Sequence, residues 1–110
     1  MTNNVLFVCS HNRLRSPTAE QIFYSRPDLE VASAGTNNDA DNRLTSELVA
    51  WADVIVVMEK AHRLKVQKRF RPSLNGKRLI CLDIPDEFEF MEPALVKLLQ
   101  SRLVRYLPSG

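Results

Sequence analysis

The chain is predicted to fold as an α/β protein, a three-layer sandwich with a four-stranded parallel sheet and helices on both faces. Two observations lead to this class. Short apolar runs typical of buried strands alternate four times with segments of helical character. Strands connected through helices also pair in parallel through right-handed crossovers, which place helices on both sheet faces. The length of 110 residues suits one domain, so residues 1–110 are expected to form a single unit.

The strands are recognised by their apolar, β-branched composition. The run around Val54–Val57 is the most apolar, and a continuous apolar run is typical of a central strand buried on both faces. Asn75-Gly76 provides the turn that leads into the last strand. The predicted strands are residues 3–8, 30–34, 53–58 and 78–82.

The helices are recognised by their ends and by apolar spacing. Pro27 and Pro72 each follow a helical segment, and the residue before proline disfavours helix. Thr45 is a good cap for a short helix, and leucines at helical spacing mark the last one. Gly35 to Asp39 has strong turn chemistry. The predicted helices are residues 16–25, 45–51, 60–70 and 93–106.

The composition is that of a soluble globular protein, with 45% hydrophobic and 25% charged residues. A net charge of +2 is too small to imply nucleic acid as a partner. No apolar run reaches membrane-spanning length, and residues 1–15 are too polar for a secretory signal. We therefore expect a cytoplasmic protein with no membrane or nucleic-acid partner. The sequence does not specify its oligomeric state.

The two cysteines, Cys9 and Cys81, end different predicted strands. A cytosolic thiol pair is seldom a structural disulfide. The two cysteines and two histidines are scattered, so they make no convincing metal site. No metal and no cofactor are expected.

The turn between the first strand and the first helix is the strongest functional candidate. Backbone N–H groups in such a turn converge on one point, and the helix dipole favours an anion such as phosphate there. Cys9 stands at the start of the turn, where the same groups favour its thiolate. Arg15 adds a planar donor for two phosphate oxygens, and Asn12 tolerates a left-handed backbone. The alternative is a buried core thiol at Cys9 with Arg15 merely solvated.

The segment Cys9-Ser10-His11-Asn12-Arg13-Leu14-Arg15-Ser16-Pro17 resembles the signature of the low-molecular-weight protein tyrosine phosphatases. That signature is a Cys, five residues with Asn third, and then Arg-Ser-Pro. The resemblance spans nearly the whole chain, although the chain is short for the family. The shortfall lies mainly between Thr36 and Arg43, where the family usually has another helix. The resemblance continues through residues 33–36, 43–45, 52–59 and 84–86.

The resemblance implies hydrolysis of phosphotyrosine or a similar aryl phosphate through a phosphocysteine intermediate. Its substrate would be a phosphorylated protein or a small aryl phosphate. Cys9 would be the nucleophile, and loop amides together with Arg15 would hold the phosphate oxygens. The implied phosphate-binding residues are Ser10, His11, Asn12, Arg13, Leu14 and Arg15.

Asp86 is the expected general acid, because it follows Ile84-Pro85, where the resemblance places the family's catalytic Asp, and because it stands on the rim that also carries Cys9. Asp83 and Glu87 are the rival carboxylates. The alternative for Asp86 is a solvated loop carboxylate. Glu87 stands where the family commonly has Pro, and Phe88 fits the family's aromatic position, where it can stack on a phenyl phosphate. Glu87 and Glu89 place negative charge near the site, which favours a basic substrate.

Supporting roles also follow from the resemblance. Asn12 would tie the loop together, Ser16 would donate to the Cys9 thiolate, and Ser33 would belong to the network that holds Asn12. Ala40 replaces a His that the family often has in this network, so Asn37 or Asn38 would have to rebuild it. Leu14 replaces the second Cys of many members, which leaves Cys9 open to further oxidation.

Two other functions fit the sequence less well. A thiol arsenate reductase would need a resolving thiol near Cys9, and only Cys81 is present. A non-catalytic module that binds phosphate or a phosphoprotein is suggested by the shortened chain, Ala40 and the acidic loop. The basic stretch 62–78 is interpreted as one solvated helix face and its loop, with docking of an acidic partner or of nucleic acid as the alternative.

Overall fold

The computed structural model describes residues 3–107. Its four strands form one parallel sheet in the order β2-β1-β3-β4. This architecture confirms the predicted α/β class, and each strand boundary lies within one residue of its predicted position. The strands are β1 (Asn3–Cys9), β2 (Leu29–Gly35), β3 (Val54–Val57) and β4 (Arg78–Cys81).

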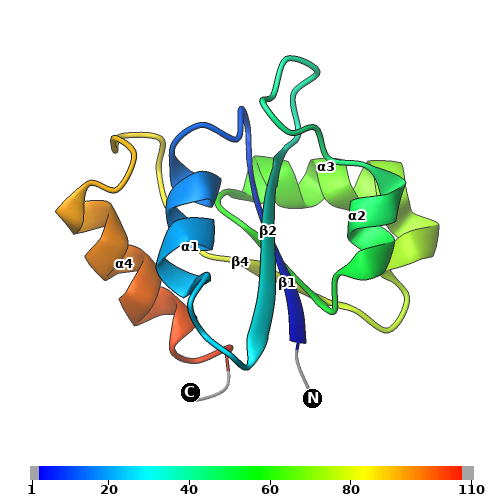
Figure 1. Ribbon diagram of the computed structural model, residues 1–110. Coiled ribbons are helices and arrows are strands. Elements are labelled where there is room, and N and C mark those ends of the chain that lie inside the picture. The colour runs from blue at the N-terminus through cyan, green and yellow to red at the C-terminus, as the bar shows by residue number, and fades with distance from the viewer. Residues whose placement is uncertain (1–2, 108–110) are drawn as a thin grey trace.

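Helices cover both faces of the sheet, as Figure 1 shows. Two helices, α1 (Arg15–Phe23) and α4 (Pro93–Leu103), pack on one face. On the other face lie α2 (Ser46–Trp51) and α3 (Lys60–Phe70), which continues into a 3₁₀ turn, η1 (Arg71–Leu74). No helix within residues 3–107 is long and apolar enough to span a bilayer.

The core is divided by the sheet because successive side chains on a strand point to opposite faces. In β1, Val5 and Phe7 pack beneath α1 and α4, whereas Leu6 and Val8 pack beneath α2 and α3. All four residues of β3 are buried, which confirms its predicted central place. The strands β1 and β3 are therefore packed on both faces, and this packing fixes the positions of their carboxyl ends in the sheet.

Three loops meet at the carboxyl edge of the sheet, at the top of Figure 1. They follow β1, β2 and β4, so residues distant in sequence share one rim. The loop after β2 contains no helix and reaches α2 directly. Gly35 permits its close approach, because a Cβ there would lie 2.5 Å from the Ala40 Cβ and 2.6 Å from the Ser10 carbonyl oxygen.

Candidate active site

The turn after β1 forms a cradle, defined here as residues 9–15. Cys9 is 3% exposed at the strand end, and α1 begins at Arg15. Asn12 has a φ of 58°, the left-handed conformation that asparagine tolerates well. A cavity of about 230 Å³ opens over the turn and is lined by Cys9, Ser10, His11, Arg13, Leu14, Arg15 and Asp86.

The Cys9 thiol lies against a hydroxyl that is itself oriented. The Ser16 Oγ lies 3.0 Å from the Cys9 Sγ, and the Asn12 Nδ2 donates to the same Oγ at 3.0 Å. The hydroxyl hydrogen can then point to sulfur or to the Ala34 carbonyl oxygen, which is farther away at 3.4 Å. The shorter contact favours donation to sulfur, which stabilises a thiolate.

Arg15 is a buried cation rather than a solvated side chain, with only 2% of its surface exposed. Its Nη1 donates to the Ile84 carbonyl oxygen at 2.8 Å and to the Glu59 Oε1 at 2.5 Å. Its Nε lies 3.7 Å from the Asp86 Oδ1. Glu59 supplies the charge partner that a buried guanidinium requires, and it engages only one edge of the fork.

Glu59 and His62 belong to the site although the sequence pattern did not assign them to it. The Glu59 N–H donates to the His62 Nδ1 at 3.1 Å, so this nitrogen carries no proton. The other ring nitrogen, Nε2, therefore donates to the Ser10 Oγ at 2.8 Å. Burial lowers the pKa of His62 to about 4, and the charge of Arg15 adds to this effect. Neutral His62 thus contacts Ser10 near the start of the cradle, while Glu59 contacts Arg15 at its end.

The basic stretch 62–78 is only partly the solvated face expected from sequence. Arg63 and Lys68 are exposed, but His62 is 2% exposed. Arg69 donates from Nη1 to the Thr36 carbonyl oxygen at 2.8 Å. The spacing Glu59-x-x-His62 at the start of α3 was the available signal, since such a pair forms a capping box.

The loop after β2 forms a wall of the cradle. Its N–H groups at Thr36, Asn37 and Asp41 donate to the carbonyl oxygens of residues 9, 10 and 11, at 2.9, 3.0 and 3.1 Å. At the rim, the Arg13 Nε lies 3.2 Å from the Asp41 Oδ1, and His11 lies 3.3 Å from Asp39. The shortened segment therefore supports the cradle directly through its backbone.

Ser33 does not join the Asn12 network, which corrects the expectation from the resemblance. Its hydroxyl donates to Glu20 of α1, because Ser33 pairs with Phe7 in the sheet and α1 covers this face. The amide of Asn37 contacts the ring of His11 at 3.5 Å and accepts from Lys65 at 3.5 Å, so it does not contact Asn12. Within the described chain, Asn12 is tied instead to Ser16.

The loop after β4 brings Asp86 into the site but not Phe88. The Asp86 side chain is 55% exposed and lines the cavity. Phe88 packs partly buried against the core beneath α1 and α4 and does not line the cavity. Burying the aromatic ring in the core is more favourable in free energy than leaving it exposed at the rim. The apolar contribution to the cavity wall comes from Leu14.

These features define an α/β domain with a buried thiol at the start of the turn between β1 and α1. The family model for "Low molecular weight phosphotyrosine protein phosphatase" matches residues 4–50. A probable low molecular weight protein-tyrosine-phosphatase, AmsI of Erwinia amylovora, is 31% identical over 73% of this chain and 72% of its own length. The chain therefore belongs to the low molecular weight protein-tyrosine-phosphatase family.

Solved structures agree with the fold. Vibrio vulnificus Wzb in complex with benzylphosphonate is 25% identical, has a TM-score of 0.76, and matches over 96% of this chain and 97% of its own. The YwlE arginine phosphatase from Geobacillus stearothermophilus has a TM-score of 0.72 over 98% of this chain and 99% of its own. At 21% identity, this second likeness concerns the fold alone.

Proposed function

We propose that the protein hydrolyses aryl phosphate monoesters, with phosphotyrosine in proteins as the substrate class, through a phosphocysteine at Cys9. The observation that carries the proposal is the cavity shared by Cys9, buried Arg15 and Asp86. Membership of the family supports it, as does the structural relative whose bound benzylphosphonate combines a phenyl ring with a phosphonate.

In the first step, the Cys9 thiolate attacks phosphorus, so that a P–S bond forms as the ester P–O bond breaks. Charge on the equatorial oxygens is held by the cradle N–H groups and by the Nε and Nη2 of Arg15. The Nη1 of Arg15 is engaged by Glu59 and the Ile84 carbonyl oxygen, which fixes the plane of the guanidinium. Protonated Asp86 gives its proton to the departing phenoxide.

In the second step, water attacks the phosphocysteine. The Asp86 carboxylate accepts a proton from the water, the P–S bond breaks, and inorganic phosphate leaves. Electrons of the broken bond return to sulfur, and the Ser16 hydroxyl at 3.0 Å stabilises the thiolate that reforms. The cycle restores both groups to their starting protonation states.

The arsenate reductase alternative is not favoured. Cys81 ends β4, which is separated from β1 by β3 in the sheet. Its thiol donates to Asp83 and does not line the cavity over Cys9. Both cysteines are free thiols, which suits the reducing cytoplasm that we propose as the compartment.

Hydrolysis of p-nitrophenyl phosphate and of a phosphotyrosyl peptide tests the function. We expect Cys9→Ser to lose at least about 10³-fold in turnover, because the nucleophile is lost. The matched control, Cys81→Ser, should retain activity near that of the parent protein. A binding module would bind the phosphopeptide without turnover. Undiminished hydrolysis by Cys9→Ser, or preferential turnover of a phosphoarginyl peptide, would contradict the proposal.

A further inference from the structure

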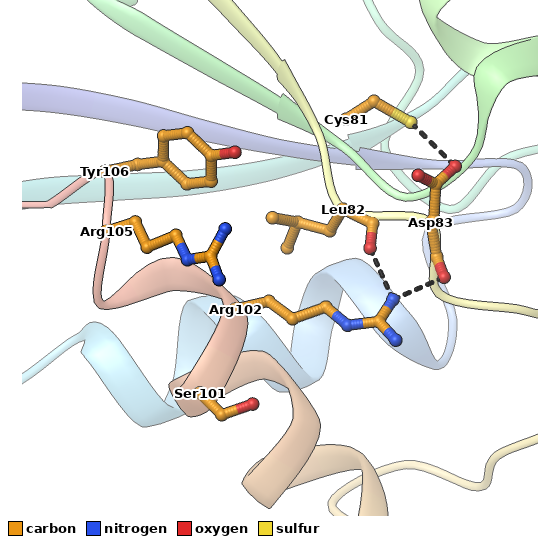
Figure 2. Close-up of a pocket in the computed structure, with 7 residues that line it drawn as sticks. All are labelled: Cys81, Leu82, Asp83, Ser101, Arg102, Arg105 and Tyr106. Carbon is orange, nitrogen blue, oxygen red and sulfur yellow. Dashed lines mark hydrogen bonds between the residues drawn. The ribbon is translucent and has the colours of Figure 1, made fainter.

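A second cavity lies between the carboxyl end of β4 and the end of α4 (Figure 2). Its volume is about 430 Å³, against about 230 Å³ for the cavity over Cys9. A volume of this size is typical of small-molecule sites. The two cavities share none of their lining residues, and the second is lined by Cys81, Leu82, Asp83, Ser101, Arg102, Arg105 and Tyr106.

Arg102 is held in place at one side of this cavity. Its Nη1 donates to the carbonyl oxygens of Leu82 and Asp83, each at 2.6 Å. Figure 2 shows the side chain crossing from α4 to these two residues. A guanidinium has five N–H donors, and these two bonds engage a single nitrogen. The remaining edge of Arg102 is a preoriented donor in the cavity.

The charge of the cavity is positive. Arg102 and Arg105 contribute two cations, and Asp83 is the one acid among the lining residues. Within residues 3–107, neither arginine has a carboxylate within ion-pair distance. The Asp83 carboxylate instead accepts from the Cys81 thiol at 3.5 Å. Two cations against one carboxylate in the same lining favour an anion in the cavity.

Two hydroxyls belong to the same lining, those of Ser101 and Tyr106. The Ser101 hydroxyl donates to the Leu98 carbonyl oxygen at 3.3 Å, so the Tyr106 hydroxyl is the neutral donor of the two. Figure 2 shows that Arg105 and Tyr106 both come from the turn that follows α4. The main chain of Tyr106 is bonded to β4, because Arg78 donates to the Tyr106 carbonyl oxygen at 3.2 Å. The donors therefore come from the last turn of α4, which carries Arg102, and from the turn that follows it, which carries Arg105 and Tyr106.

We propose that this cavity binds a small multivalent oxyanion, with Arg102 and Arg105 as its principal ligands. The chemistry suits two phosphate or carboxylate groups on one small molecule, because two planar guanidinium forks each match one such group. This site is separate from the phosphate cradle of Cys9.

Cys81 provides a local reporter of occupancy. With Cys9 replaced, the variant Cys9→Ser keeps Cys81 as its single thiol. Burial raises the pKa of the Cys81 thiol, so alkylation by uncharged iodoacetamide is followed at a fixed alkaline pH and constant ionic strength. Pyrophosphate is the phosphate probe and citrate is the carboxylate probe. Phosphatase activity is not measured, so failure of this proposal and failure of the proposed function are distinguishable.

We expect at least one of the two anions to slow Cys81 alkylation in a saturable way. Arg105→Gln should raise the half-saturating concentration about fivefold to tenfold, which is the effect of one partly exposed charged contact. Arg105 makes no hydrogen bond within the described chain, so this change should leave the fold intact. Lys97→Gln is the matched control, since it removes one charge from the exposed face of α4 outside the cavity.

The proposal is overturned if neither anion protects Cys81 beyond sodium chloride of equal ionic strength. It is also overturned if the half-saturating concentration is the same in Arg105→Gln and its parent. An equal rise of the half-saturating concentration in Lys97→Gln would mean that the net charge of the protein, and not this cavity, causes the effect. That result would likewise overturn the proposal.

Discussion

The two halves of the active site are held in very different ways. The cradle half is built around the buried residues Cys9, Asn12 and Arg15. It is held by backbone hydrogen bonds from the loop after β2 and by side-chain hydrogen bonds from Glu59 and His62. The acid half is a surface loop in which Asp86 is 55% exposed and lies 3.7 Å from the Arg15 Nε. In the proposed mechanism, the cradle half stabilises charge in a fixed geometry, whereas the acid half moves a proton.

The difference between the two halves indicates which catalytic step requires a fixed geometry and which step tolerates a more mobile group. Stabilising charge on the phosphoryl oxygens depends on donors fixed within tenths of an ångström, so the cradle has to be rigid. Proton transfer follows the leaving group and can proceed from a looser position. Arg15 joins the halves, because its Nη1 donates to the carbonyl oxygen of Ile84, two residues before Asp86.

The largest expected effect comes from the residue that joins the two halves. Arg15→Lys keeps the charge but cannot hold Glu59, Ile84 and a phosphate together. We expect kcat/KM for p-nitrophenyl phosphate to fall roughly 10²–10⁴-fold. Arg71→Lys, at an exposed position, is the control. Near-normal turnover in Arg15→Lys would place Arg15 outside the chemistry.

The acid half is tested by the leaving group. Asp86→Asn should slow turnover of phenyl phosphates with poorly acidic phenols by roughly 10²-fold or more, and of p-nitrophenyl phosphate far less. A graded series of phenyl phosphates measures this dependence. Glu87→Gln is the matched control, as the next carboxylate in the same exposed loop. A uniform loss across the series in Asp86→Asn, with a steeper dependence in Glu87→Gln, would transfer the role to Glu87.

The same contrast explains what could be predicted from sequence. The strands, the cradle and the left-handed Asn12 follow from local patterns, because apolar runs and turn chemistry act over a few residues. Glu59 and His62 were missed because their role depends on β3 lying beside β1, which brings the start of α3 to the cradle. Phe88 and Ser33 were misassigned because a resemblance fixes residue type but not the direction of the side chain.

A smaller effect, on stability, is expected from a substitution at Gly35, where the loop after β2 contacts the cradle. Gly35→Ala places a Cβ against Ala40 and the Ser10 carbonyl oxygen, so the free energy of unfolding should fall by about 2 kcal/mol. Gly76→Ala is the control; its φ of 80° disfavours alanine, but open space surrounds it, and about 1 kcal/mol is expected. Urea titrations measure both. Equal losses would mean that the loop is not packed tightly on the cradle.

An effect of the same order on the free energy of unfolding is expected from the titration of His62. Its pKa of about 4 in the folded protein lies below the ordinary value of 6.5, so the unfolded chain binds more protons between these values. Stability should therefore be full above about pH 6.5 and fall as the pH drops towards 4, by on the order of 2 kcal/mol from this group. His62→Gln should flatten the slope in this window, which urea titrations at a series of pH values measure. An unchanged slope in His62→Gln would contradict a buried neutral imidazole.

The central claim is that the phosphoryl group passes through Cys9. Turnover of p-nitrophenyl phosphate can be stopped within milliseconds by denaturant. After digestion, the mass of the peptide that contains Cys9 can be measured by mass spectrometry. We predict one phosphoryl group on Cys9, formed at the rate of the first release of p-nitrophenol and lost as phosphate appears. Continued turnover with no adduct on Cys9, or with the adduct on another residue, would contradict the account.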